Sequence, residues 1–110
     1  MPNVKFYVDA RNGPAASDAI SGILPTLRDL ICETLEVPVA ACQFAVIPVA
    51  GMDDQPAINT ELQLLPGPAR TPEYLRCVAQ RLRDELAQAT GLSVAVRMSS
   101  LDPVTYVALK

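Results

Sequence analysis

Pro2 is the residue whose type and position point most directly to chemistry. When the initiating Met1 is removed, a proline in second place becomes a secondary amine at the amino terminus. An unperturbed α-amino group titrates near ~7.7–8.0, and burial in an apolar pocket or nearby arginines lower that pKa. Because the chain contains no histidine, this amine is a candidate general base near neutral pH. The alternative interpretation is that Met-Pro is merely a common way for a chain to begin.

The other side chains exclude several kinds of function. Without histidine there are no histidine-based triads and no histidine-ligated metal sites, and we expect neither a metal nor a cofactor. Twelve acidic residues against nine basic ones give a net charge of −3, which disfavours binding to nucleic acid. The three cysteines, Cys32, Cys42 and Cys77, show no CxxC spacing, and we expect them to be reduced thiols buried in the core.

The length of 110 residues predicts one domain, residues 1–110. Half of the residues are hydrophobic and under a fifth are charged, which is typical of a globular chain. No apolar run approaches the ~20 residues that span a bilayer, so we expect no membrane partner. The first residues lack the basic and apolar regions of a signal peptide, so we expect a cytoplasmic protein.

Short runs of β-branched, aromatic or apolar residues predict the strands of a sheet. Four such strands are expected at residues 2–8, 43–49, 60–65 and 92–98, with a short fifth strand over residues 104–109.

Apolar residues at steps of three and four predict two helices. The first follows Ser17 and Asp18, which suit a helix start, and Pro25 either kinks it or delays its regular part. The second begins after Thr71, with Pro72 in the first turn, and Gly91 is a plausible end.

The order strand–helix–strand therefore occurs twice and divides the chain into a pseudo-repeat of residues 1–55 and 56–110. The tripeptide Leu-Arg-Asp occurs in both predicted helices, at 27–29 and 82–84. These elements predict an α+β fold of two βαβ units, in which two helices cover one face of a four-stranded sheet. Two arrangements fit: parallel pairing within each unit, or a ferredoxin-like sheet. Residues 43–49 are apolar on both faces, which favours oligomerisation over the open face and leads us to expect a homotrimer.

The chain resembles the tautomerase superfamily, the group of 4-oxalocrotonate tautomerase and macrophage migration inhibitory factor. The resemblance covers nearly the whole chain and rests on Met1-Pro2, the strand that follows at once, and the two βαβ units. Residues 64–73, Leu-Leu-Pro-Gly-Pro-Ala-Arg-Thr-Pro-Glu, resemble the family's entry into a helix. The segment 24–27 and the pair Thr105-Tyr106 are similar to a small bacterial branch of it.

This resemblance implies a homotrimer in which an amino-terminal proline moves protons between carbon and oxygen of a small carboxylate. Pro2 matches the catalytic proline. Arg70 matches an arginine that follows the first strand of a βαβ unit, where a guanidinium can hold a carboxylate. Arg97 and Arg11 are further candidates for binding substrate. Tyr106 is of interest because a carboxyl-terminal strand can cross onto a neighbouring subunit in this superfamily.

Two functions follow from the sequence. The first is a keto–enol tautomerase that acts on a small 2-oxo or enol carboxylate, with Pro2 as base. The second is an inactive oligomeric module that binds a small ligand or a protein. The second function predicts no activity whatever the state of Met1. The first requires that Met1 be removed, since a retained methionine turns the Pro2 nitrogen into an amide, which cannot act as a base.

Overall fold

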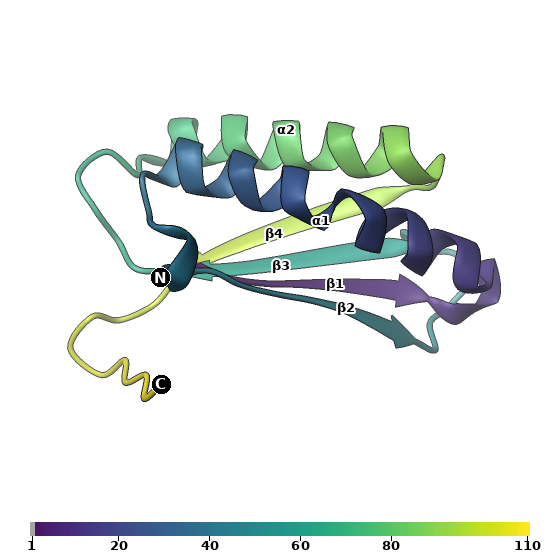
Figure 1. Cartoon of the computed structure of the whole chain (residues 1–110), viewed down its shortest axis with the longest axis horizontal. Helices are drawn as coiled ribbons and strands as arrows, with labels where there is room; N and C mark the ends of the chain where they lie inside the picture. The colour runs from purple at the N-terminus through teal and green to yellow at the C-terminus, as the bar shows by residue number, and fades with distance from the viewer. Residues whose placement is uncertain (1) are drawn as a thin grey trace.

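The computed structural model describes residues 2–110, which form one four-stranded sheet with two helices on one face (Figure 1). The elements in chain order are β1 (Asn3–Asp9), α1 (Pro14–Leu35), β2 (Gln43–Val49), β3 (Ile58–Leu64), α2 (Pro72–Thr90) and β4 (Val94–Ser100). The sheet order is β2-β1-β3-β4. β1 runs parallel to β2, β3 runs parallel to β4, and the two central strands, β1 and β3, are antiparallel. This confirms two side-by-side βαβ units and excludes the ferredoxin-like order.

Helix α1 begins at Pro14, three residues before the predicted start at Ser17. Gly13 precedes it with φ +71°. A proline suits the first turn because the N–H groups of that turn have no acceptor within the helix, so a residue without an N–H loses no hydrogen bond there. Pro25 lies inside the helix, which continues through it. A proline there removes one backbone hydrogen bond, and Figure 1 shows that α1 bends along its length. The helix ends where Glu36 adopts a left-handed conformation, φ 54° and ψ 54°.

Helix α2 has the predicted ends. The Thr71 side chain accepts a hydrogen bond of 3.2 Å from the backbone N–H of Tyr74, and Pro72 occupies the first turn. Gly91 ends the helix with φ +70°, a conformation that glycine adopts without steric cost. α1 and α2 pack beside each other over the sheet (Figure 1).

The core lies between the helices and the sheet. Leu27 of α1 and Leu82 of α2, the first residues of the repeated tripeptide, are both fully buried. The predicted apolar stripes supply most of the helical contribution, and alternate residues of β1 and β3 supply the centre. The fully buried large side chains are Val4, Phe6, Val8, Ile20, Leu27, Ile31, Ile58, Leu62, Leu64, Val78, Leu82 and Leu86.

The open face of the sheet differs from the prediction of an apolar surface. The apolar side chains there are mainly those of β2, Ala45, Ile47 and Val49, all partly exposed, with Ala95 from β4. The other strands place polar residues on that face, because the sequence alternates with period two along each of them. These polar residues are Asn3, Lys5, Tyr7, Asn59, Glu61, Gln63, Arg97 and Ser99.

The predicted fifth strand over residues 104–109 is not formed within the chain. Residues 103–105 form a turn, and residues 106–110 are not part of a strand. A strand forms only where its backbone can pair with the edge of a sheet. Figure 1 shows that the tail instead leaves the sheet near the start of β1. Val104, Val107 and Leu109 are consequently 89, 77 and 94% exposed.

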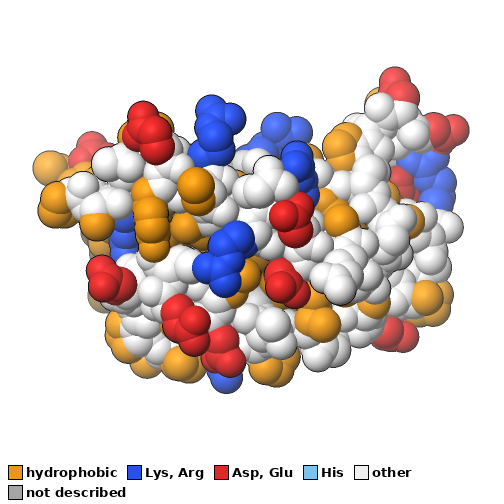
Figure 2. Space-filling view, turned by 90° about the horizontal axis from the view of Figure 1, so that it is seen from above, with side chains coloured by type: hydrophobic (Ala, Val, Ile, Leu, Met, Phe, Trp, Pro, Cys, Tyr) orange, Lys and Arg blue, Asp and Glu red, His pale blue; other side chains and the backbone are white. Residues whose placement is uncertain are grey.

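The helix-covered face carries charges of both signs. Figure 2 shows basic side chains interspersed with acidic ones over this face, with apolar side chains between them. Among residues 2–110, no helix has the length and apolar character needed to cross a bilayer.

Candidate functional site

Pro2 is buried at the entrance to β1. Its carbonyl oxygen accepts a hydrogen bond of 3.1 Å from the backbone N–H of Gln43, which extends the β1–β2 pairing by one residue. Met1, whose removal the predicted chemistry requires, lies outside the described residues. Because β1 is a central strand with neighbours on both sides, the position of Pro2 is fixed by the sheet itself.

A cavity of about 230 Å³ opens beside Pro2. Its wall comes from three segments that are distant in the sequence: the start of β1, the turn before β2, and the carboxyl-terminal tail. The lining residues are Pro2, Asn3, Ala40, Ala41, Cys42, Gln43, Tyr106, Ala108, Leu109 and Lys110. Lys110 donates a hydrogen bond of 3.1 Å from Nζ to the carbonyl of Ala40, which holds the tail over the cavity. The sequence drew attention to Tyr106 but gave no sign that residues 108–110 reach this place.

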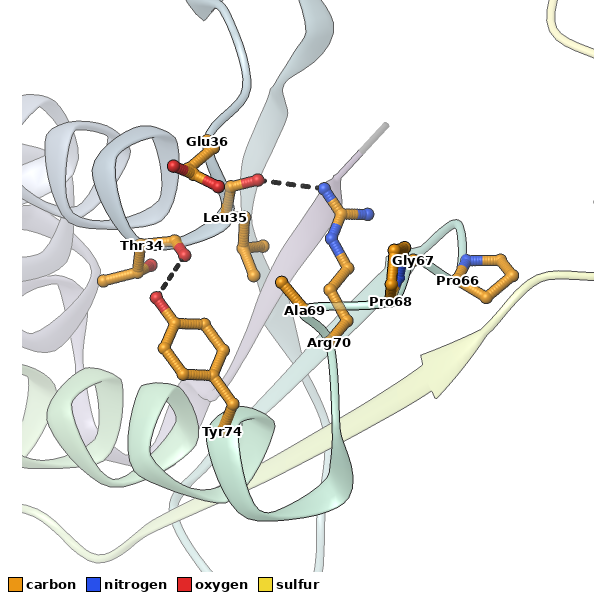
Figure 3. A pocket seen from close by; sticks show the side chains of 9 residues that line it. All are labelled: Thr34, Leu35, Glu36, Pro66, Gly67, Pro68, Ala69, Arg70 and Tyr74. Atoms are coloured by element: carbon orange, nitrogen blue, oxygen red, sulfur yellow. Dashed lines mark hydrogen bonds between the residues drawn. The ribbon is translucent and has the colours of Figure 1, made fainter.

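Arg70 lies at the same end of the sheet as Pro2, in a different cavity. Asn3 pairs with Gln63 in the antiparallel β1–β3 ladder, so the start of β1 is next to the end of β3, and Arg70 is in the loop that follows β3. The Arg70 guanidinium donates hydrogen bonds to the carbonyls of Leu65, at 2.6 Å, and Leu35, at 3.0 Å. Arg70 is thus tied to the carboxyl end of α1, as Figure 3 shows.

The cavity around Arg70 measures about 620 Å³ and lies between the end of α1 and the start of α2. Tyr74 crosses it and donates a hydrogen bond of 2.5 Å to the carbonyl of Thr34 (Figure 3). The last carbonyls of a helix have no partner within the helix, so Arg70 and Tyr74 together cap α1. A cation at this end also interacts favourably with the helix dipole. The sequence did not reveal this role, because Arg70 and Leu35 are 35 residues apart.

Arg11 lies at the other end of β1 from Pro2. Seven strand residues separate them, which corresponds to roughly 20 Å. Arg11 forms an ion pair with Asp9, with 2.6 Å between Nη2 and Oδ2, and a second ion pair with Asp53 from the β2–β3 loop. The hydrogen bond from Arg11 holds the pKa of the Asp9 carboxyl below its usual value, and the same contact raises the pKa of Arg11. Within one chain, Arg11 therefore does not join Pro2.

Arg97 lies on the open face of β4. Its Nε donates a hydrogen bond of 3.2 Å to Oδ1 of Asn59 on the neighbouring strand, and the side chain is exposed. It lies two strands away from β1 and three residues before the strand end. The structure therefore brings none of the three candidate arginines into the cavity that Pro2 lines.

The cysteines differ from the prediction of three buried thiols. Cys77 is exposed on α2, and Cys32 and Cys42 are only partly buried. The sulfurs of Cys32 and Cys42 are 3.5 Å apart, because the turn after α1 brings the chain back beside the helix. Burial raises the pKa of the Cys42 thiol to about 11, and the neighbouring Cys32 adds to the shift.

Comparison with known proteins identifies the fold. No family model and no curated protein matches the sequence. Among solved structures, a fused 4-OT described as a wild-type symmetric trimer has a TM-score of 0.69 and 19% identity, over 90% of this chain and 85% of that one. A macrophage migration inhibitory factor-like protein from Entamoeba histolytica has a TM-score of 0.73 and 13% identity, over 98% and 95%. A member of the cis-3-chloroacrylic acid dehalogenase family has a TM-score of 0.75 and 13% identity, over 96% and 79%.

These likenesses establish that the chain has the tautomerase and MIF-like fold, and they confirm the resemblance seen in the sequence at the level of fold. The matches cover 90–98% of this chain and 79–95% of the compared chains.

Proposed function

We propose that the chain is a tautomerase-like isomerase acting on a small 2-oxo or enol carboxylate, with Pro2 as the general base after removal of Met1. The observation that carries the proposal is the burial of Pro2 in the wall of a cavity, directly before a central strand. The proteins that share the fold include a fused 4-OT and a MIF-like protein, which supports the same assignment.

The proposed reaction uses one proton carrier. The neutral Pro2 amine removes the proton from the enol hydroxyl, the electron pair shifts through the enolate, and the ammonium delivers a proton to carbon to give the ketone. A base must be neutral to begin this cycle. We expect the burial of Pro2 to favour the neutral form, because burial penalises the charged ammonium.

Arg70 is the proposed anchor for the substrate carboxylate. It lies at the same end of the sheet as Pro2, and its two carbonyl bonds use two of the five N–H groups of a guanidinium. A carboxylate that approaches the guanidinium of Arg70 can accept hydrogen bonds from the remaining N–H groups. The two bonds that cap α1 then stay intact. Arg11 and Arg97 are proposed as contributors from neighbouring subunits, since neither lies beside Pro2 in its own chain.

A homotrimer is the proposed assembly. Its motivation is the apolar strip of β2 on the open face, together with the exposed apolar side chains of the tail, Val104, Val107 and Leu109. A cyclic trimer buries both and covers the sheet edges. Light scattering after gel filtration should give three times the chain mass of 11.8 kDa. A mass of one chain at micromolar concentration would falsify the trimer.

The catalytic proposal is tested by following ketonisation of phenylenolpyruvate. The intact mass must first show that Met1 is absent. We expect kcat/KM to rise with pH through an apparent pKa below ~7.7–8.0. Pro2→Ala should lose most of the activity, because the amine becomes primary and changes its basicity and geometry, while the assembly stays intact.

Two matched controls separate the site from general damage. Pro56→Ala changes an exposed loop proline and should leave kcat unchanged. Arg70→Ala should raise KM for carboxylate substrates more than it lowers kcat, whereas Arg83→Ala, on the exposed surface of α2, should change neither. Chains with a demonstrably free Pro2 that ketonise no such substrate, or a Pro2→Ala variant as active as the wild type, contradict the proposal.

A further inference from the structure

Cys32 and Cys42 lie close enough for a bond that the proposed isomerase chemistry does not use. Their sulfurs are 3.5 Å apart, in hydrogen-bonding contact, whereas a disulfide needs about 2.05 Å. Closing this gap takes a movement of roughly 1.5 Å, which is within the range of small side-chain adjustments. The contact joins the last turn of α1 to the residue that precedes β2.

The backbone on both sides of the pair is already fixed. The carbonyl of Cys32 accepts from the N–H groups of Glu36 and Val37, which close the end of the helix. The N–H of Cys42 donates to the carbonyl of Val39 at 3.1 Å, and its thiol lies 3.8 Å from the carbonyl of Pro38. The two cysteines are therefore held beside each other by the turn and need no rearrangement of the chain to meet.

Both sulfurs are within reach of a small oxidant. Each residue is only partly buried, and Cys42 lines the cavity of about 230 Å³ beside Pro2. Cys77 is exposed on α2, far along the sequence from the pair, and is the thiol most open to disulfides between chains.

We propose that Cys32 and Cys42 form a reversible intramolecular disulfide that locks the turn between α1 and β2. With a peroxide as oxidant, one thiol attacks the peroxide oxygen and becomes a sulfenic acid, with release of one water. The second thiol then attacks that sulfur and displaces the second water, so that two thiols and one hydrogen peroxide give one disulfide and two waters. A thiol reductant restores the pair. The inference stands whatever the state of Met1, and its failure is separate from a failure of the isomerase proposal.

The test uses the full chain carrying Cys77→Ser, which prevents disulfides between chains through the exposed thiol. Treatment with hydrogen peroxide should reduce the titratable thiols from two to none and lower the mass of the segment that holds Cys32 and Cys42 by about 2 Da, the two hydrogens lost. Oxygen added at methionines such as the exposed Met52 is counted separately. Peptide mapping should recover a fragment that links Cys32 to Cys42, and dithiothreitol should reverse the change. Because the bond closes a ring over residues 32–42 in the unfolded chain, the Tm should rise by about 5–15 °C.

The matched controls are Cys42→Ser and Cys32→Ser in the same background, each of which keeps one thiol. Neither should show the 2 Da loss, and peroxide should not raise the Tm of either. The proposal is overturned if both thiols stay titratable after peroxide treatment, if Cys32 or Cys42 gains oxygen instead of losing hydrogen, or if the linked protein melts below its reduced form.

Discussion

Replacing Arg70 with alanine should destabilise the fold as well as weaken the proposed binding of carboxylates. The change removes two hydrogen bonds from a charged donor, one to Leu65 and one to Leu35. Such bonds contribute about 1.5–3 kcal/mol each when buried. Here both carbonyls border an open cavity, so water can replace the guanidinium. We therefore expect the free energy of unfolding to fall by about 1–2 kcal/mol in total.

Urea unfolding at matched protein concentration measures this loss, since any assembly makes stability depend on concentration. Tyr74→Phe removes the neutral bond to Thr34 and should lower the free energy of unfolding by about 0.5–1.5 kcal/mol. Arg83→Ala, which loses a surface contact to Gln80, should stay within about 0.5 kcal/mol of the wild type. If Arg70→Ala and Arg83→Ala unfold at the same urea concentration, the capping of α1 by Arg70 contributes no stability and the reasoning fails.

Three further substitutions test individual features. Thr60 is fully buried, and within residues 2–110 its hydroxyl has no partner, so Thr60→Val should raise the free energy of unfolding in urea by about 1 kcal/mol. Glu36→Gly should relieve the strain of the left-handed backbone and raise the free energy of unfolding by up to about 1 kcal/mol. Glu33→Gly, inside α1, should lower it by about 1 kcal/mol. Equal effects of the two changes would contradict a strained backbone at Glu36. The hydrogen bond from Arg11 lowers the pKa of Asp9 in the folded chain, so this contact adds stability above about pH 4. That stability is lost as pH falls through the folded pKa. Asp9→Asn should therefore reduce the difference between the free energies of unfolding at pH 6 and pH 3.

The sequence predicts the elements because local patterns determine them. The period-two and helical repeats place all four strands and both helices, although β3 and β4 are displaced by about two residues from their predicted bounds. The start of α1 differs from the prediction because Pro14 fits a first turn better than a turn before the helix. The open face differs because β2 is an edge strand with a continuous apolar sequence, whereas polar residues alternate more regularly in the other strands.

The candidate site was less accessible to sequence reasoning, because its geometry depends on contacts between distant residues. The burial of Pro2 follows from its place before a central strand, but nothing local indicated that Lys110 reaches Ala40, 70 residues earlier. The capping of α1 by Arg70 likewise spans 35 residues. The meeting of Cys32 with Cys42 depends on a turn whose path the apolar periodicity does not describe.

The internal repeat explains why the proposed chemistry is confined to one end of the sheet, the end where Pro2 lies. An offset of 55 residues, which relates Leu27 to Leu82, also relates Asn3 at the start of β1 to Ile58 at the start of β3. The counterpart of Pro2 is then Ala57, an interior residue whose nitrogen is an amide and cannot become a basic amine. Because β1 and β3 are antiparallel, these two positions lie at opposite ends of the sheet. The repeat thus supplies a symmetric frame, and the single terminal amine makes the two ends chemically different, which predicts one reactive site per chain.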